Sequence, residues 1–283
     1  MQSKPIRNRH RVLPSPRAAA AIAALAGALA LPGQALAQWT DANFSFRVGG
    51  FFPKVDTKAR ADGNGGIVGS TIDFESDLGL DDSKTLPIVD LEWRFAQNHR
   101  ISLNYLDLSR DATGALRGSL TWQGQVYPIN TTVHSEFDSK ILAFSYLWSY
   151  YHTPETELSV GIGIHNANLK ASLAAVGNNT GLGVTRETSV NAPLPILTLR
   201  AAQKFSPNIG AELRYQWFGI KYGDFDGSLN VFNAAISYYP WRNWGIEAGY
   251  NYSKYDLKVS KDKWNGEANY KFNGPVLSFV GSF

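Results

Sequence analysis

The chain of 283 residues has no cysteine and only one methionine. Without thiols it has no disulfide bonds, no thiolate metal site and no cysteine for lipid attachment, so packing and hydrogen bonds must hold the fold. Beyond residue 37 no stretch of about 18 apolar residues occurs, which excludes membrane-spanning helices. Aromatic residues are abundant instead, with 8 Trp, 13 Tyr and 15 Phe.

The first 37 residues have the order of parts of a secretory signal. A basic start precedes an almost wholly apolar run over residues 18–31, and Ala35-Leu36-Ala37 is an A-x-A cleavage site. The apolar run is too short for a transmembrane anchor, which needs about 20 residues. We therefore expect residues 1–37 to be removed as a signal peptide, leaving a single domain over residues 38–283.

The basic character of the whole chain belongs to this signal. The chain has 27 basic and 24 acidic residues and a net charge of +3. Five of the basic residues and none of the acidic ones lie before residue 38, so the remainder has 22 basic and 24 acidic residues, a net charge of −2. This balance gives no reason to expect nucleic acid as a partner.

Hydrophobic residues after the signal recur mainly with period 2, the period of a β-strand. Ile209, Leu213 and Trp217, for example, share one face, and Glu212 and Arg214 share the other. The alternating segments run to about ten residues, longer than most globular strands and long enough for a tilted strand to cross a bilayer. Ten strands are predicted, at residues 43–54, 85–95, 100–110, 136–149, 157–170, 191–204, 209–222, 228–239, 244–257 and 268–283.

The connections between these segments alternate in length. Those after the second, fourth, sixth and eighth segments are short and contain turn formers such as Asn98 and Asn243. Those after the first, third and fifth are long, at residues 55–84, 111–135 and 171–190. Short periplasmic turns with long outer loops are typical of outer-membrane barrels. We expect the second long loop to extend its flanking strands as a hairpin around residues 122–125.

The last predicted strand alternates through Leu277 and Phe279 and closes on Phe283. Together with the signal, the ten alternating segments and the loop pattern, this ending resembles the small outer-membrane β-barrel proteins of Gram-negative bacteria. The resemblance implies an all-β fold, a transmembrane antiparallel up-and-down β-barrel of about ten strands, located in the cell outer membrane.

The same resemblance implies partners. It makes Phe283 part of a sorting signal that the barrel assembly machinery reads, and it adds outer-membrane lipids and lipopolysaccharide as surroundings. No cofactor is expected, and the oligomeric state is left open.

Aromatic residues gather near both ends of the predicted strands, as in the girdles that flank the hydrocarbon layer of a membrane. Those near the short turns are Trp93, Phe95, Trp148, Tyr238 and Trp244. Those near the long loops are Trp217, Tyr252 and Tyr270.

Eight charged residues fall on the predicted inner faces of the strands. They are Arg47, Asp90, Glu92, Arg94, Arg200, Glu212, Arg214 and Glu247. One interpretation is a lumen filled by mutually neutralising ion pairs, because buried charges need partners. The other is a narrow polar conduit whose constriction these side chains set. Ten strands are too few for a broad porin channel.

Two histidine positions are the candidates for catalysis in a membrane-embedded hydrolase. His165 is predicted to face inward, and no serine stands two positions after it. His134, Ser135 and Glu136 are adjacent, but neighbouring residues of a strand point to opposite faces, so only His134 and Glu136 share a side. A hydrogen-bonded filler is the simpler role for a lone histidine in a polar lumen, and we expect no enzyme activity.

Residues 71–83 are acidic, with carboxylates at the alternating positions Asp73, Glu75 and Asp77. In an extended strand these would line one side and offer oxygen ligands to Ca²⁺. The segment is not an EF-hand loop, because Leu78 stands where that motif needs glycine. A solvated acidic strand end is the simpler interpretation, so no metal is assigned.

These patterns predict the architecture of the protein but say little about any substrate. The leading function is a structural barrel or a narrow channel for small solutes. The alternative is a surface-interaction protein whose long outer loops bind lipopolysaccharide or another cell, and a hydrolase is the third.

Overall fold

The computed structural model describes residues 42–63, 67–176, 185–222, 225–261 and 264–283. The chain divides into two compact units, Met1–Ala35 and Leu36–Phe283, and all described residues belong to the second. The predicted signal peptide, residues 1–37, lies outside the described residues. Across the described ranges, no helix is long and apolar enough to cross a membrane.

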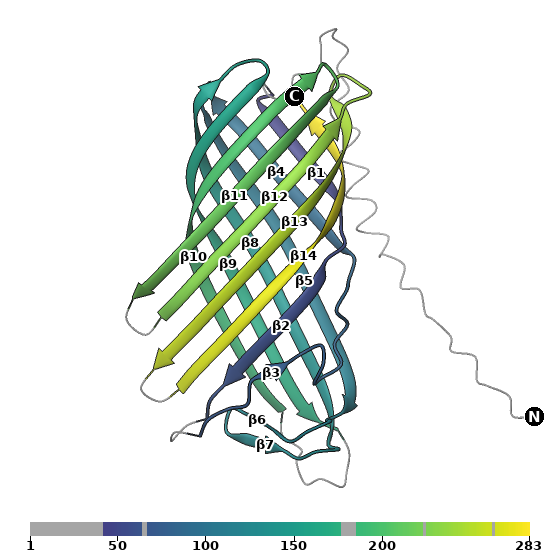
Figure 1. Ribbon diagram of the computed structural model, residues 1–283, viewed down its shortest axis with the longest axis vertical. Coiled ribbons are helices and arrows are strands. Elements are labelled where there is room, and N and C mark those ends of the chain that lie inside the picture. Colours follow the sequence, from purple (N-terminus) through teal and green to yellow (C-terminus); the bar gives the residue numbers. More distant parts are fainter. Residues whose placement is uncertain (1–41, 64–66, 177–184, 223–224, 262–263) are drawn as a thin grey trace, which may run out of the picture. The chain divides into compact units, whose positions relative to one another are not determined.

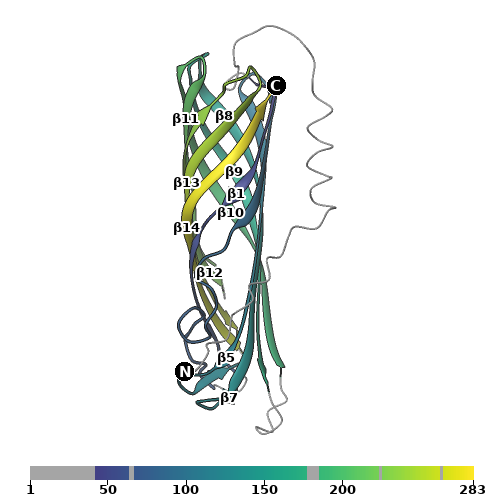
Figure 2. The same cartoon turned by 90° about the vertical axis from the view of Figure 1, so that its right-hand side faces the viewer.

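Ten antiparallel strands form a closed barrel (Figures 1 and 2). Each strand pairs antiparallel with its neighbours along the barrel, and the last strand pairs again with the first. The strands are β1 (Phe44–Phe51), β4 (Leu86–Ala96), β5 (His99–Ala115), β8 (Thr132–His152), β9 (Thr156–Ala175), β10 (Thr185–Ser206), β11 (Ile209–Tyr222), β12 (Phe225–Tyr238), β13 (Trp244–Lys261) and β14 (Trp264–Ser282). The predicted fold class, an all-β antiparallel barrel of ten strands, is confirmed.

The first predicted strand, residues 43–54, is interrupted at Phe52 and Pro53. β1 ends at Phe51, where it still pairs with both β4 and β14. After the break, β2 (Lys54–Ala61) continues along β14. Proline has no N–H to give to a ladder, so it is confined to strand ends, edges and bulges. The prediction of a loop from residue 55 onward was therefore wrong.

Residues 72–85 complete the barrel wall between β2 and β5. β4 begins only at Leu86, so the outer part of β5, residues 107–115, has its ladder with β8 and none with β4. The two-residue strand β3 (Ile72–Asp73) pairs with β2 on one side of this segment. Further along the segment, Ser83 forms an isolated antiparallel bridge with Lys54 of β2, and Lys84 Nζ donates to the carbonyl oxygen of Ser109 on β5.

Arg110 fastens this wall segment to the barrel. It is buried on the inner face of β5, with Nη1 2.5 Å from Glu75 Oε1 and 3.0 Å from the carbonyl oxygen of Asp81. Its Nη2 donates to Thr57 Oγ1 of β2 at 2.6 Å, and its guanidinium lies 5.4 Å from the ring centre of Phe137. One side chain therefore ties β2, β5 and the wall segment together.

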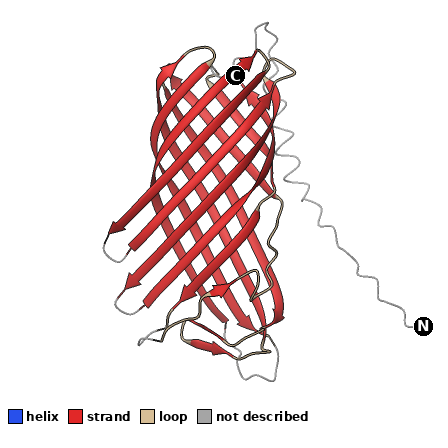
Figure 3. Ribbon diagram, viewed as in Figure 1, coloured by secondary structure: helices blue, strands red, loops and turns tan. Residues whose placement is uncertain are grey.

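A small hairpin lies across the outer mouth of the barrel (Figure 3). β6 (Leu120–Trp122) and β7 (Gln125–Tyr127) form their own two-stranded sheet. The hairpin predicted around residues 122–125 is present, but it is a separate sheet and does not extend β5 and β8. It hydrogen-bonds to the carbonyl oxygens of Ala61 on β2 and Leu173 on β9.

The two faces of the long strands exchange polarity about halfway along. In the half nearer the short turns, β8 exposes Leu142 and Trp148 on its outer face. In the other half, the outer face of β8 is polar from Lys140 onward, and its inner face buries Phe137 and Val133. The register with β9 has no shift at this point, so the environment changes while the pairing does not.

Neighbouring strands make the same exchange at similar positions. The outer face changes from apolar to polar between Tyr105 and Asp107 on β5, Ile164 and Asn166 on β9, and Tyr252 and Lys254 on β13. A belt of exposed apolar side chains thus surrounds the half near the short turns, as a hydrocarbon layer requires. The outer half has a polar outside and an apolar inside, as water-soluble proteins do.

An aromatic core fills the outer half of the barrel. The ring of Phe137 lies 5.5 Å from that of Phe74 and 5.3 Å from that of Tyr270, and Tyr255 stacks on Phe272 at 5.9 Å. Tyr270 is 1% exposed. The prediction that Tyr270 belongs to an outer aromatic girdle was therefore wrong, because by this point of β14 the inner face is the apolar one.

Candidate functional site

A layer of charged side chains crosses the lumen at the level of the apolar belt. All eight inward charges named from the sequence lie in it. They are Arg47 on β1, Asp90, Glu92 and Arg94 on β4, Arg200 on β10, Glu212 and Arg214 on β11, and Glu247 on β13. Side chains alternate between the two faces of each strand, and the charged ones fall on the inner face. On β11, for example, Arg214 is 7% exposed, whereas its neighbour Leu213 is 50% exposed.

Arg47 lies at the centre of this charged layer. Its Nε is 3.1 Å from Glu247 Oε1, its Nη2 is 3.1 Å from Glu212 Oε2, and its Nη1 is 3.4 Å from Glu92 Oε1. Arg214 reaches from β11 to the same Glu92 and bonds Glu212 at 2.9 Å. The pairs of Arg47 with Glu212 and Glu247, and the pair of Arg214 with Glu92, join strands that are not neighbours in the wall, so they span the lumen.

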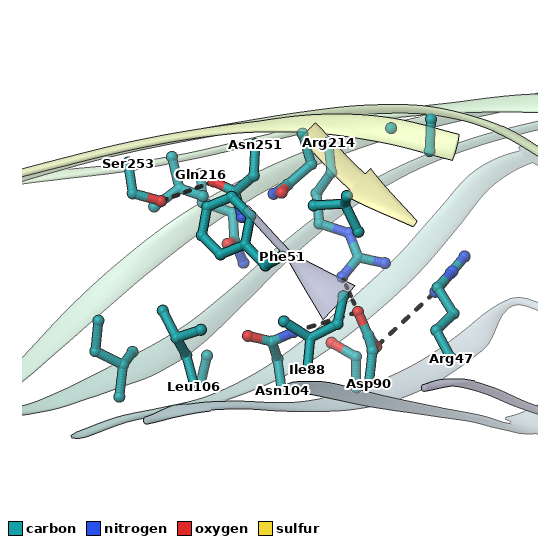
Figure 4. Close-up of a pocket in the computed structure, with 18 of the residues that line it drawn as sticks. Arg47, Phe51, Ile88, Asp90, Asn104, Leu106, Arg214, Gln216, Asn251 and Ser253 are labelled. Atoms are coloured by element: carbon teal, nitrogen blue, oxygen red, sulfur yellow. Dashed lines mark hydrogen bonds and ion pairs between the residues drawn. The ribbon is translucent and has the colours of Figure 1, made fainter. Parts of the chain in front are cut away.

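Asp90 is the most loosely held carboxylate of the layer. Its oxygens lie 3.9 Å from Arg47 Nη1 and 3.9 Å from Arg214 Nη1 (Figure 4). Asn104 on β5 donates to it from Nδ2 at 3.4 Å. Asp90 therefore lies where the charged layer gives way to neutral polar side chains.

Two members of the layer were not named from the sequence, Arg100 on β5 and Glu157 on β9. Glu157 is 0% exposed and is surrounded by three arginines. Its carboxylate lies 2.9 Å from Arg100 Nη2, 3.0 Å from Arg200 Nη1 and 3.0 Å from Arg94 Nη2. Both missed residues stand at the first positions of their predicted strands, where the alternation has only begun.

With these two included, the layer consists of five arginines and five carboxylates, so its formal charges cancel. Pairing of this kind offsets the cost of removing charges from water when the hydrogen bonds are good. The layer thus occupies the lumen at this level with side chains that are paired with one another across it.

A cavity of about 120 Å³ lies between the charged layer and the aromatic core (Figure 4). Arg214, Asn104 and Gln216 line its polar side, and Phe51 and Leu106 line its apolar side. This volume admits a few water molecules. The lumen thus narrows to a small polar space with packed side chains on either side of it.

His165 lines this cavity and is 4% exposed. Its Nδ1 is 3.3 Å from the Tyr255 hydroxyl and its Nε2 is 3.2 Å from Gln216 Oε1. Both ring nitrogens thus have neutral partners, as a hydrogen-bonded filler requires.

His134 and Glu136 lie side by side on the outer face of β8, as their spacing predicts. His134 Nε2 is 3.1 Å from Glu136 Oε1, and its Nδ1 is 2.9 Å from Thr113 Oγ1. Ser135 points into the barrel and is 0% exposed. The serine is therefore separated from the histidine by the sheet itself.

The acidic residues Asp73, Glu75 and Asp77 do not line one side of an extended strand. Residues 74–78 form a turn, in which Asp73 accepts the Ser76 N–H and Asp77 accepts the Asp73 N–H, each at 2.9 Å. Glu75 points the other way, to Arg110. In the part of the chain that the structure describes, no three acidic or histidine side chains come together as metal ligands. The expectation of an extended acidic strand was wrong, because the turn separates the carboxylates.

Asp73 is held in its ionised form within this turn. Burial on its own would raise the pKa of Asp73, but hydrogen bonds from Ser76 and the charge of Lys58 outweigh it and hold the pKa below its usual value. The Lys58 ammonium lies 3.6 Å from the carboxylate and comes from β2. The ionised Asp73 therefore contributes an ion pair that links β3 to β2.

Phe283 closes the seam of the barrel at the short-turn end. Its ring stacks on Phe46 at 6.5 Å and meets Trp244 edge-on at 5.3 Å. Its backbone N–H and C=O both bond to Phe44 of β1. Its role as a sorting signal stays a prediction.

No protein-family model and no curated protein matches the chain. Solved structures do match it. The outer-membrane protease OmpT from Escherichia coli aligns with a TM-score of 0.50 and 10% identity, over 89% of this chain and 99% of that one. OprG, an outer-membrane protein from Pseudomonas aeruginosa, aligns with a TM-score of 0.39 and 11% identity, over 86% of this chain and 97% of that one.

At such low identity the likeness to OmpT shows the fold alone, and the TM-score of OprG is too low to support an argument. The closed ten-strand barrel and its belt of exposed apolar side chains independently indicate an outer-membrane barrel fold. The chain therefore has the fold of a Gram-negative outer-membrane β-barrel protein, and its apolar belt fits that location.

Proposed function

We propose that the protein is a structural outer-membrane barrel with a closed lumen, which holds a folded outer half above the lipid. The observation that carries this proposal is the charged layer. Its cross-lumen pairs, such as Arg47 with Glu212 and Arg214 with Glu92, join opposing parts of the wall. Glu157 and Arg100 within it are 0% and 1% exposed.

A second layer supports the same proposal. The aromatic core of the outer half packs Phe74, Phe137 and Tyr270 inside the barrel, and each is at most 4% exposed. A hydrated ion would have to disperse both this core and the charged layer. If only the charged layer or only the aromatic core opened, the other would still block the lumen.

Planar-bilayer recording tests the proposal. The refolded barrel should insert without stable conductance steps. The double variant Glu92→Gln with Arg214→Gln, which removes one cross-lumen pair without leaving a lone charge, should also stay silent because the aromatic core remains. Discrete, ion-selective openings of the unmodified protein would overturn the closed barrel. They would favour the narrow channel for small solutes, with the charged layer as its constriction.

A surface-interaction function is the second candidate, and the β6–β7 hairpin favours it. Val126 and Ile129 are 53% and 54% exposed at the outer mouth, although Tyr127 between them is buried. Exposed apolar side chains at a tip are suited to contact a partner. Replacing both with serine should lower adhesion of expressing cells to other cells or surfaces while the barrel stays folded.

We also propose that the barrel is not an enzyme. His165 is engaged by Tyr255 and Gln216, and Ser135 lies on the other face of the sheet from His134. Cleavage of peptides, or a changed mass spectrum of lipid A in expressing cells, would count against this.

A further inference from the structure

The wall of the outer half has a side opening between β10 and β11. The ladder that joins these two strands ends at Leu197, which lies opposite Trp217. Beyond this pair, and among the described residues, residues 185–196 of β10 pair with β9 alone and residues 218–222 of β11 pair with β12 alone. The barrel is therefore closed at the level of the charged layer and open on one side further out.

Two prolines explain why the ladder stops there. The Lys204 N–H donates to the carbonyl oxygen of Glu155 at 2.7 Å, on the β9 side of β10. Alternate residues of a strand bond to the same neighbour, and the β9–β10 ladder has no shift of register, so Pro193 and Pro195 present their nitrogens to β11. Continued pairing would place Pro195 opposite Gly219, but proline has no N–H to donate. The opening is therefore encoded in the sequence of β10.

An apolar pocket of about 50 Å³ lies inside the outer half, beside the unpaired part of β10. Trp122 of the β6–β7 hairpin, Leu169 of β9, Val190 of β10, Leu257 of β13 and Ala268 of β14 line it. None of the described residues of β11 or β12 lines it, although these strands stand between β10 and β13 in the order of the wall. The pocket therefore adjoins the side opening.

The charged residues at the border of this pocket are already paired. The pairs, at 3.0, 3.0 and 3.3 Å, are Lys170 with Glu187, Glu267 with Lys258, and Arg60 with Asp62. Lys170 and Glu267 belong to the outer face, because they alternate with Ala171 and Ala268, which line the pocket from inside. The pocket thus offers a ligand apolar contacts and no unpaired charge among the described residues.

Trp122 adds one polar group to the apolar lining. The side chain is 1% exposed, and its Nε1, the only polar atom of an indole, has no hydrogen-bond partner among the described residues. Phe74 meets the indole edge-on at 6.3 Å and supplies no acceptor oxygen. Buried donors are normally bonded to protein or to bound water. A buried water needs roughly two to four polar partners, which this apolar lining does not offer.

We propose that this pocket binds an uncharged apolar molecule with one acceptor oxygen, such as a medium-chain ketone, and that the Trp122 indole donates to that oxygen. A cavity that takes up benzene is about three times as large, so only the oxygen-bearing end fits inside. The rest of the chain lies in the side opening, along the unpaired part of β10. Ile220, on the inner face of β11 yet 43% exposed, gives that opening an apolar side. The proposal does not depend on whether the lumen conducts.

NMR titration of the barrel in lipid nanodiscs tests the proposal, with 2-nonanone and nonane as probes. The ketone should move the Trp122 indole N–H signal downfield in a saturable way, because a new hydrogen bond forms there. The methyl signals of Val190 and Leu257 should respond to both probes. Nonane, which lacks the oxygen, should bind about fivefold more weakly. A Trp122 signal that contacts water and does not move with the ketone would overturn the proposal, as would equal affinity for the two probes.

Trp122→Phe keeps an aromatic ring and removes the donor. Followed through the same methyl signals, its affinity for 2-nonanone should fall about fivefold, to that for nonane. Trp241→Phe is the matched control, because it makes the same exchange at a position that is 64% exposed beside a short turn, and it should leave both affinities unchanged. Equal effects of the two substitutions would count against the site. A heat-dependent shift on gels confirms that each variant is folded before it is titrated.

Discussion

Glu157 has three arginines around its carboxylate and no exposure to solvent. Buried charges of this kind are stable only as a set, because each one removed leaves its partners uncompensated in a region of low dielectric. At the scale of single residues, the charged layer is therefore the part of the barrel least tolerant of substitution.

Glu157→Gln should lower the free energy of unfolding by about 3–5 kcal/mol, since it keeps the shape of the side chain but leaves three arginines without its charge. Urea unfolding of the barrel in detergent or lipid measures this. Glu155→Gln, in the exposed turn two residues earlier, is the control and should change stability by no more than about 0.5 kcal/mol. Equal effects of the two substitutions would contradict the role of the layer.

At the scale of elements, the barrel wall is not made of strands alone. Residues 72–85 stand between β2 and β5, and Arg110 holds them through Glu75 and the carbonyl of Asp81. The segment has few ladder bonds of its own, with β3 only two residues long. Side-chain contacts therefore hold this segment in place, whereas backbone hydrogen bonds hold the long strands.

Arg110→Ala should loosen this segment while the ten strands persist. Hydrogen–deuterium exchange of residues 72–85 should rise at least tenfold, because opening the segment no longer requires breaking the bonds from Arg110 to Glu75 and to the carbonyl of Asp81. Arg117→Ala, in the exposed part of the next loop, should leave that exchange unchanged. A uniform rise along all strands would instead mean that Arg110 supports the whole barrel.

At the scale of the whole molecule, two environments divide the barrel across its axis. One half has lipid outside and charge inside, and the other has water outside and an aromatic core inside. The long strands β8, β9, β13 and β14 run through both halves, with no shift of register where the environment changes. The membrane therefore covers only about half the length of the longest strands.

A lysine scan along one face of β9 tests this division. Ile162→Lys, within the apolar belt, should lower stability in lipid bilayers by about 2–4 kcal/mol. Asn168→Lys lies on the same face of the same strand but beyond the exchange, and should be close to neutral. Folding yield and urea stability in vesicles measure both, and similar costs at the two positions would place the lipid boundary elsewhere.

The sequence predicted the barrel well because alternation over ten segments is a strong signal, and it is strongest where outward apolar residues meet inward polar ones. It also placed the inward charges, from Arg47 to Glu247, on the correct face by parity. Applying the same parity to the first residue of two predicted strands would have added Arg100, in phase with Ser102, and Glu157, in phase with Ser159.

The outer half was harder to predict, because the hydrophobic phase shifts there. On β13, Tyr252 points outward and Tyr255 points inward. A strict period of 2 places these two residues on opposite faces, so it cannot show that both lie on the apolar side of the strand at their own position. β2 has the same pattern, with charges outward and Val55 and Ala59 inward, but it follows Pro53 and was assigned to a loop. The bonds of Arg110 join residues far apart in the chain, and no local pattern reveals them.

The position of the polarity exchange also determines how far the barrel extends beyond the lipid. On β9, ten residues from Asn166 to Ala175 lie beyond the exchange. At about 3.3 Å per residue and a tilt of roughly 40°, they raise the rim about 25 Å from the lipid. The β6–β7 hairpin therefore lies well away from the lipid, at the end of the barrel opposite the apolar belt.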